Sequence, residues 1–138
     1  MAEARARGQE VVGLSRTQLD VTDAALVRQV VSRHRPDAVV HCAAHTSVDR
    51  AESEPDHARA VNRDGARNVA MAAAECGSER LYVSTDYVFD GRKRSPYVPS
   101  DETGPLSVYG RTKLEGEKAV TEALPGSLVV RTSWLYGG

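Results

Sequence analysis

The sequence predicts an α/β protein, in which helices alternate with the strands of a parallel sheet. Residues 37–42 and 80–84 are short, largely apolar runs of the kind that form buried parallel strands. The segments around these runs carry apolar residues at helical spacing, which gives a βαβα order and predicts a sheet covered by helices on both faces. At 138 residues, with 41% hydrophobic and 27% charged residues, the chain has the size and composition of one domain.

The first part of the chain predicts a helix end, a strand and a helix. Residues 1–8 resemble the tail of a helix that stops at Gly8, and residues 10–14 have the apolar content of a strand. Thr22 is a candidate N-cap for the next helix. The apolar side chains of that helix recur at helical spacing until Pro36 ends it.

The second part of the chain predicts two helices and two strands around a long loop. The loop, residues 85–107, is rich in Gly, Pro, Ser and charge and shows no regular periodicity. Loops of this length in compact domains are usually functional or mobile. Pro55 can open the first of the two helices and Gly77 can end it. The four regular elements are residues 55–77, 80–84, 108–120 and 127–132.

Tyr109 and Lys113 are four residues apart, so a helix over residues 108–120 places both side chains on one face, about a turn apart. A free phenol has a pKa of about 10, and a nearby ammonium lowers this pKa because it stabilises the phenolate. Thr85 ends the preceding strand, at the edge where ligands collect in open α/β sheets. The three residues predict an acid for hydride chemistry on a carbonyl. The alternatives are a solvated helix face for the pair and a turn-capping hydroxyl for the threonine.

Six segments of the chain resemble the extended short-chain dehydrogenase/reductases, and within them the dTDP-4-dehydrorhamnose reductases: residues 19–23, 35–49, 60–62, 84–91, 109–113 and 131–137. Tyr-x-x-x-Lys is shared by the whole superfamily. Ser-Thr-Asp-Tyr-Val-Phe-Asp-Gly followed by Arg-Thr-Ser-Trp is more particular to the rhamnose-pathway reductases. The resemblance covers nearly the whole chain. It implies a Rossmann-like, doubly wound parallel sheet, with residues 1–138 forming part of an NAD(P)-binding domain.

The family pattern opens with a strand and a glycine-rich turn that receives the cofactor pyrophosphate, and residues 1–138 show neither. Most of the C-terminal substrate region is also missing. We therefore expect an internal piece of a longer reductase, and one explanation is a misplaced start with the true N-terminus about 25 residues upstream by the usual element lengths. In the family's strand order the missing strand lies between residues 10–14 and 37–42, so its loss removes two ladders. Such a chain is expected to fold poorly alone or to rearrange its pairing.

The resemblance implies a reaction and three catalytic residues. The reaction is reduction of the 4-keto group of dTDP-4-dehydro-L-rhamnose by NADPH, giving dTDP-L-rhamnose for cell-surface polysaccharide. Tyr109 would protonate the substrate oxygen, Lys113 would bind the nicotinamide ribose and lower the tyrosine pKa, and Thr85 would hydrogen-bond the substrate carbonyl. Two alternatives stay open: a non-catalytic relative such as the regulatory subunit of methionine adenosyltransferase, and an inactive fragment.

Five residues are implied on the cofactor side, in addition to Tyr109 and Lys113. Arg16 follows the second expected strand, where an acidic residue would bind the ribose of NAD and an arginine can pair with a 2′-phosphate. This favours NADPH and leaves NADH open, and an exposed loop arginine is an equally good interpretation. The other four resemble an adenine-contacting segment and a close-packed strand end: Asp20 and Val21, then Ala43 and Ala44.

On the substrate side, the resemblance implies that Asp86, Tyr87 and Val88 line the sugar pocket. Trp134 would reach the substrate from the strand end beyond Arg131, and a place in the core is the alternative for a tryptophan. Asn62 resembles a position that steadies the neighbouring strand ends, with helix capping as the alternative.

Composition limits the classes of partner. A net charge of −1 gives no reason to expect nucleic acid or an acidic membrane surface. No apolar run approaches the roughly 20 residues of a membrane span, so we expect a cytoplasmic protein. The partner that the family resemblance implies is a nucleotide sugar. The two cysteines lack the spacing of a redox or zinc motif, and the histidines suggest no metal site. A homodimer of the longer form is left open.

Overall fold

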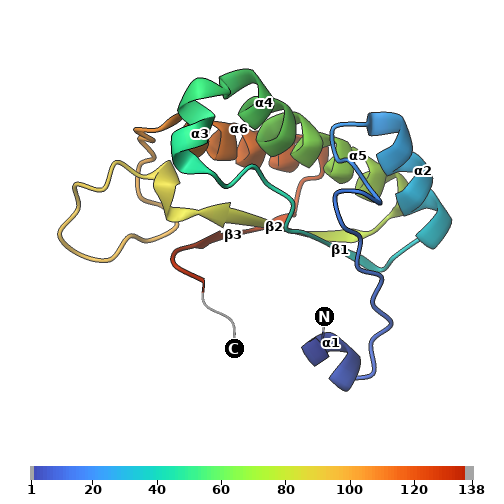
Figure 1. Cartoon of the computed structure of the whole chain (residues 1–138). Coiled ribbons are helices and arrows are strands. Elements are labelled where there is room, and N and C mark those ends of the chain that lie inside the picture. The colour runs from blue at the N-terminus through green and yellow to red at the C-terminus, as the bar shows by residue number, and fades with distance from the viewer. Residues whose placement is uncertain (1, 136–138) are drawn as a thin grey trace.

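The computed structural model describes residues 2–135 and shows a three-stranded parallel sheet with helices packed on one face (Figure 1). This confirms the predicted α/β class. The strand order is β1-β2-β3, η1 is a π-helical segment and η2 is a 3₁₀ turn. The elements are α1 (Ala2–Ala6), α2 (Ala24–His34), β1 (Ala38–His41), α3 (Val48–Ser53), α4 (Pro55–Arg59), η1 (Ala60–Gly65), α5 (Ala66–Cys76), β2 (Glu79–Thr85), η2 (Asp86–Val88), α6 (Val108–Ala123) and β3 (Leu128–Thr132).

The register of the sheet places the ends of β2 and β3 side by side. Thr85 pairs with Thr132, the last residue of β3, so both strands stop at the same level. β1 stops earlier, because His41 pairs with Tyr82. The last residues of β2 therefore extend beyond β1, and the polypeptide after each strand leaves from one edge of the sheet, as expected of a parallel α/β protein.

Helix α2 begins one residue later than the sequence predicts. Its N-cap is Asp23, whose carboxylate accepts a hydrogen bond from the amide of Leu26 at 2.9 Å. Thr22 is not the cap, because its hydroxyl and amide both donate to the carboxylate of Asp20 in the preceding turn. The helix ends as expected before Pro36, with Arg35 in the left-handed conformation at φ 42°.

The predicted helix over residues 55–77 is present, but its middle is not α-helical. Pro55 occupies the first turn of α4 and Gly77 caps α5 with φ 69°, as the sequence predicts. Between these helices, η1 widens the turn where Asn62 and Gly65 face the core. The short helix α3 was not predicted, because six residues carry too little periodicity to be recognised.

Two apolar clusters hold the helices on the sheet. The larger joins Val21, Val27 and Val31 to Val69 of α5, and the smaller joins Ala66, Tyr82 and Val120. These residues are all 8% exposed or less, which is where burial stabilises the fold most. A side chain at Gly65 would meet Val21 at 2.6 Å, so glycine lets the segment before α2 approach the helix layer.

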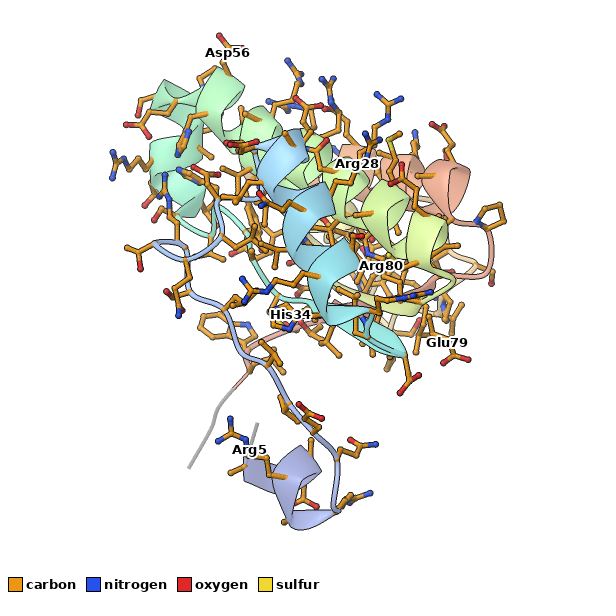
Figure 2. The ribbon with its side chains drawn as sticks, turned by 90° about the vertical axis from the view of Figure 1, so that its right-hand side faces the viewer. Arg5, Arg28, His34, Asp56, Glu79 and Arg80 are labelled. Atoms are coloured by element: carbon orange, nitrogen blue, oxygen red, sulfur yellow. The ribbon has the colours of Figure 1, made fainter. Side chains whose placement is uncertain are left out.

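Two sequence predictions are wrong for the part of the chain that the structure describes. Residues 10–14 form no strand, since no described residue pairs with the outer edge of β1 and an isolated strand leaves its backbone groups unpaired. The sheet is also not covered on both faces: α2 to α6 lie on one side, while α1 has no buried residue and stands apart (Figure 1). Figure 2 shows the same separation around Arg5. Val40 is accordingly 62% exposed and Leu128 58%.

Candidate active site at the end of β2

The end of β2 and the first turn of α6 bring Thr85 and Tyr109 together. Ser107 caps α6 by accepting from the amide of Gly110 at 3.0 Å, and Tyr109 occupies the first turn. The hydroxyl of Thr85 also accepts from the amide of Tyr87 at 3.3 Å, which caps η2. The Thr85 hydroxyl donates to the carboxylate of Asp86 at 3.2 Å, and its closeness to the phenol of Tyr109 acts to lower the pKa of that phenol. The turn-capping role and the predicted place beside Tyr109 are therefore both present in one hydroxyl.

Gly110 allows the close approach of α6 to η2. A Cβ at this position would collide with the carbonyl oxygen of Tyr87 and lie 3.1 Å from Pro105. With glycine there, the rings of Tyr87 and Tyr109 meet edge to face, 5.6 Å apart between centroids. The candidate site is thus held by backbone contact as well as by side chains.

Lys113 lies on the same helix face one turn further, but it is bound elsewhere. Its ammonium donates to the carbonyl oxygen of Val83 at 2.7 Å and lies 4.2 Å from the centroid of the Tyr82 ring. The residue is 2% exposed. Burial lowers the pKa of Lys113 to about 8, while the carboxylate of Glu117 opposes that shift.

The expectation that Lys113 lowers the pKa of Tyr109 is wrong for the chain in this state. Burial raises the pKa of Tyr109, and the neighbouring charges of Asp86 and Tyr87 raise it further. Only the neighbouring Thr85 side chain acts to lower this pKa. The ammonium of Lys113 is held against the carbonyl of Val83 and the ring of Tyr82, and its charge is not among the causes of the shift at Tyr109.

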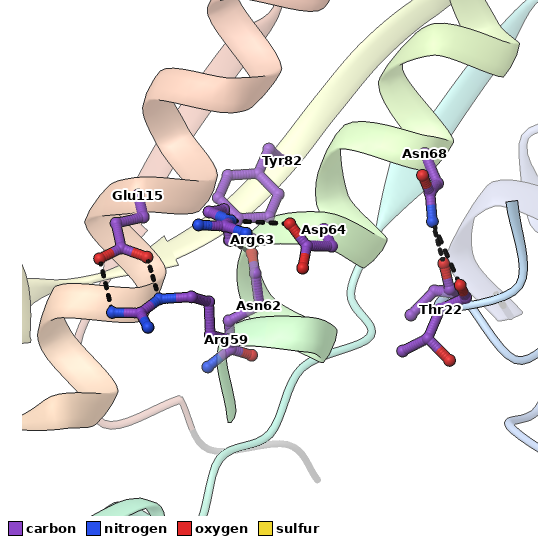
Figure 3. A network of polar contacts seen from close by, with 9 residues as sticks. Thr22, Arg59, Asn62, Arg63, Asp64, Asn68, Tyr82 and Glu115 are labelled. Atoms are coloured by element: carbon purple, nitrogen blue, oxygen red, sulfur yellow. Dashed lines mark hydrogen bonds and ion pairs between the residues drawn. The ribbon is translucent and has the colours of Figure 1, made fainter. Parts of the chain in front are cut away.

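Asn62 connects the end of β1 to helix α6. It is 1% exposed, accepts from the amide of His45 at 2.8 Å and donates to the hydroxyl of Thr112 at 3.0 Å. The phenol of Tyr82 donates to its carbonyl at 3.2 Å (Figure 3). Asn62 lies inside η1 and caps no helix, so the capping alternative is wrong, and its two bonds to the backbone of His45 hold the segment after β1.

The residues expected on the cofactor side lie on two loops. Ala43 is exposed and Ala44 half-buried directly after β1, whereas Arg16 is exposed in a turn before α2. The hydrogen bonds from Thr22 lower the pKa of Asp20, with a smaller contribution from the charge of Arg16. The side chain of Val21 packs in the core, so its backbone is the part left for ligand contact.

The residues expected on the substrate side differ in access. Tyr87 is 44% exposed and Asp86 half-buried, while Val88 is fully buried and packs in the interior. Trp134 is 80% exposed, so its alternative place in the core is wrong. Next to it, the hydroxyl of Ser133 donates to the carboxylate of Asp86 at 2.8 Å, which holds the chain after β3 beside η2.

One buried ion pair at the site was missed by sequence reasoning. Arg131 of β3 binds Glu117 of α6 through two hydrogen bonds of 2.7 and 3.0 Å, and Ser84 donates to the same carboxylate at 2.5 Å. The available signal was the spacing of Glu117, which stands four residues after Lys113 on the face of α6 that carries Tyr109.

Two grooves of the described structure lie away from the candidate active site. Grooves of about 540 and 270 Å³ lie on either side of α5, and none of Thr85, Tyr109 and Lys113 lines them. Within residues 2–135, no group of three or more His, Cys, Asp or Glu could hold a metal ion. No helix in this part of the chain is both long and apolar enough to cross a membrane.

Comparison with known proteins decides the family. Residues 1–138 match the model of the RmlD substrate binding domain. The chain belongs to the RmlD family. This confirms the resemblance carried by the sequence motifs.

Relatives of this RmlD-family chain are reductases of dTDP sugars. A dTDP-4-dehydrorhamnose reductase of Streptomyces griseus is 53% identical over 132 residues, which cover 95% of this chain and 43% of that protein. A dTDP-4-keto-6-deoxy-D-glucose reductase of Streptomyces niveus is 46% identical over 99% of this chain and 48% of that protein. The crystal structure of the dTDP-4-dehydrorhamnose reductase of Bacillus anthracis in complex with NADP matches with a TM-score of 0.94 and 41% identity, over 98% and 48% of the two chains. The chain therefore spans about half the length of the relatives that it matches.

Proposed function

We propose that this chain carries the catalytic residues of an NADPH-dependent reductase of dTDP-4-dehydro-L-rhamnose, which forms dTDP-L-rhamnose. The observation that carries the proposal is the position of Thr85, the last residue of β2, beside Tyr109 in the first turn of α6. Identity of about 50% to dTDP-4-dehydrorhamnose reductases supports the substrate class. Because nucleotide sugars and NADPH are cytoplasmic metabolites, we propose a cytoplasmic location as well.

The proposed roles follow from the groups at the site. NADPH supplies a hydride to the carbonyl carbon of the sugar. Thr85 donates to the sugar carbonyl oxygen and orients it, and Tyr109 transfers its phenolic proton to that oxygen. Burial raises the pKa of Tyr109 in the present state, so the phenol holds its proton, whereas an efficient proton donor needs a pKa nearer the operating pH. Asp86 and Tyr87 contact the sugar, with Trp134 exposed beside them and Val88 supporting them from the interior.

NADPH fits the residues on the cofactor side. The exposed guanidinium of Arg16 can pair with a 2′-phosphate, and the small side chains of Ala43 and Ala44 leave the end of β1 accessible. Asp20 and Val21 form the turn that would meet the adenine, and Lys113 would bind the nicotinamide ribose. To bind the nicotinamide ribose, the ammonium of Lys113 must leave the carbonyl of Val83 and donate to the ribose hydroxyls instead. Measurement of NADPH binding tests this change.

The test is turnover of the purified chain with NADPH and dTDP-4-dehydro-L-rhamnose. We expect loss of NADPH absorbance in step with formation of dTDP-L-rhamnose, and weaker turnover with NADH. The isomeric dTDP-4-keto-6-deoxy-D-glucose serves as the competing substrate, because a relative carries its name. Binding of NADPH without oxidation in the presence of either sugar would contradict the proposal and favour a non-catalytic relative.

A homodimer is the proposed assembly of the longer form. The groove between α5 and α6 is lined by Arg63 and Arg67 together with Asp64 and Glu122, a mixture of charges that a two-fold related copy can pair. Sedimentation of wild-type protein and of the Arg67→Glu variant tests this. We expect a dimer for the first and a monomer for the second.

A further inference from the structure

Arg131 uses every nitrogen of its guanidinium to join three parts of the molecule. Nε and Nη2 donate to the two oxygens of Glu117 in α6, at 3.0 and 2.7 Å. Nη1 donates to the carbonyl of Pro99, in the loop that precedes α6, at 3.3 Å. The guanidinium also lies 4.9 Å from the centroid of the Phe89 ring. A single side chain of β3 thus contacts both the site helix and both ends of the loop.

Glu117 connects Arg131 to the residues of the candidate site through its bond to Ser84. It lies one turn after Lys113 and two turns after Tyr109, on the same face of α6. Its Oε1 accepts from Ser84 at 2.5 Å, the residue directly before Thr85. The side chain of Glu117 is 8% exposed and that of Arg131 22%, so solvent weakens the pair much less than it weakens a surface ion pair.

The loop that Arg131 holds has an ordered interior. The ring of Phe89 stacks on Tyr97 at 4.1 Å, and the Tyr97 phenol donates to Asp90 at 2.9 Å. Lys93 and the amide of Val98 both bind the carboxylate of Asp101. These contacts tie residues 89–101 to one another, and Arg131 joins this segment to the sheet.

We propose that Arg131 is a positioning residue that fixes the loop of residues 89–106 against α6 and, through Glu117 and Ser84, aligns Thr85 with Tyr109. It acts through these neighbours and does not itself contact the substrate. The proposal deepens the proposed function and rests on it where turnover is concerned. Because η2 and this loop follow Thr85 directly, the side of the site affected is the sugar side.

The planar fork of arginine is essential to this role. Lysine keeps the charge, but one ammonium cannot bind both oxygens of Glu117 and the carbonyl of Pro99 in the same plane. Arg131→Lys is therefore the informative variant. Its matched control is Arg59→Lys, since Arg59 makes the same kind of two-bond pair with Glu115 on the outer side of α6, at 2.9 and 3.3 Å, and touches no part of the loop (Figure 3).

The first readout is amide hydrogen exchange of residues 89–106, which needs no activity. We expect exchange in Arg131→Lys to be about tenfold faster than in wild type, the factor that corresponds to losing one charge-assisted hydrogen bond. The control should keep the wild-type rate. The second readout is steady-state kinetics: in Arg131→Lys the KM for the sugar nucleotide rises about tenfold, while the KM for NADPH stays unchanged.

The outcomes separate this inference from the proposed function. Wild-type loop exchange in Arg131→Lys overturns the inference, and so does faster exchange with an unchanged KM for the sugar nucleotide. Equal effects of both lysine variants also overturn it, since they would show a general loss of stability. If the wild-type chain gives no turnover, the proposed function fails. The role of Arg131 is then decided by two other measurements, amide hydrogen exchange of residues 89–106 and the dissociation constant for dTDP-4-dehydro-L-rhamnose.

Discussion

The two faces of the sheet differ in polarity, and the face that is buried under the helices is the more polar of the two. The face under the helices carries buried polar side chains that are 5% exposed or less: His41, Arg80, Tyr82 and Ser84. Val39, Val129 and Arg131 share this face and are half-buried. The opposite face is apolar and lacks helices, and its side chains are half-buried or exposed: Val40, Leu81, Val83, Leu128 and Val130. On the covered face, Tyr82 and Ser84 are held by bonds to particular atoms, in addition to the apolar contacts of Val39 and Val129.

This difference explains why the candidate site is well defined although the molecule is small. Buried polar groups cost free energy unless they are bonded, so Tyr82, Ser84 and Lys113 each require a partner at a fixed position. Each partner lies on or beside α6, the helix that carries Tyr109. Among the described residues, Nε2 of His41 and the three guanidinium nitrogens of Arg80 are buried without a partner, and Arg80 sits deep beneath the helices (Figure 2).

Removal of the Tyr109 hydroxyl gives the largest expected effect on the covered face. Tyr109→Phe deletes the proposed proton donor, and loss of a general acid typically lowers turnover by about 10²- to 10⁴-fold. The fold should be unaffected, because the edge-to-face contact with Tyr87 needs only the ring. Turnover and the melting temperature measure the two quantities. Turnover within a factor of ten of wild type would refute the role of Tyr109.

The second effect concerns the close packing of α6 on η1. A Cβ at Gly116 would collide with the carbonyl oxygen of Asn62 and lie 2.5 Å from the Tyr82 hydroxyl, so Gly116→Ala should lower the free energy of unfolding by about 1 to 3 kcal/mol. Gly104→Ala is the control, since its Cβ would meet only Asp90 at 3.4 Å. Urea denaturation of both variants measures the difference. Equal stability would mean that α6 packs less closely than the structure shows.

The sequence predicts local elements better than it predicts contacts between them. The strand ending at Thr85 and the helix carrying Tyr109 follow from apolar runs and helical spacing, and both are present. The strand expected at residues 10–14 is absent because no described strand lies beside it to complete a ladder. The hydrogen bond from Lys113 to the carbonyl of Val83 was not predicted. It depends on the register of the sheet, because β1 ends opposite Tyr82, one residue before Val83. The roles of Thr85, Tyr109 and Lys113 stay predictions.

The third effect is a pH dependence of stability that belongs to the covered face. Burial lowers the pKa of His41 to about 3, so folding requires the neutral imidazole. As pH falls below about 6.5, the unfolded chain binds a proton that the folded chain refuses, and stability falls by up to about 1.4 kcal/mol per pH unit. His41→Phe should remove this slope between pH 6.5 and 5, above the range of ordinary carboxylates. An unchanged slope in the variant would place the titration elsewhere.

The smallest effect is expected one residue earlier, on the uncovered face. Val40 is 62% exposed, so Val40→Thr, which exchanges a methyl for a hydroxyl of similar size, should change the free energy of unfolding by less than about 0.5 kcal/mol. The same exchange at Val27, which is fully buried between α2 and α5, should cost about 1 to 3 kcal/mol because its hydroxyl would lack a partner. Denaturation in urea measures both. If Val40→Thr were as costly as Val27→Thr, the apolar face would have to be packed in solution, and the contrast between the two faces would disappear.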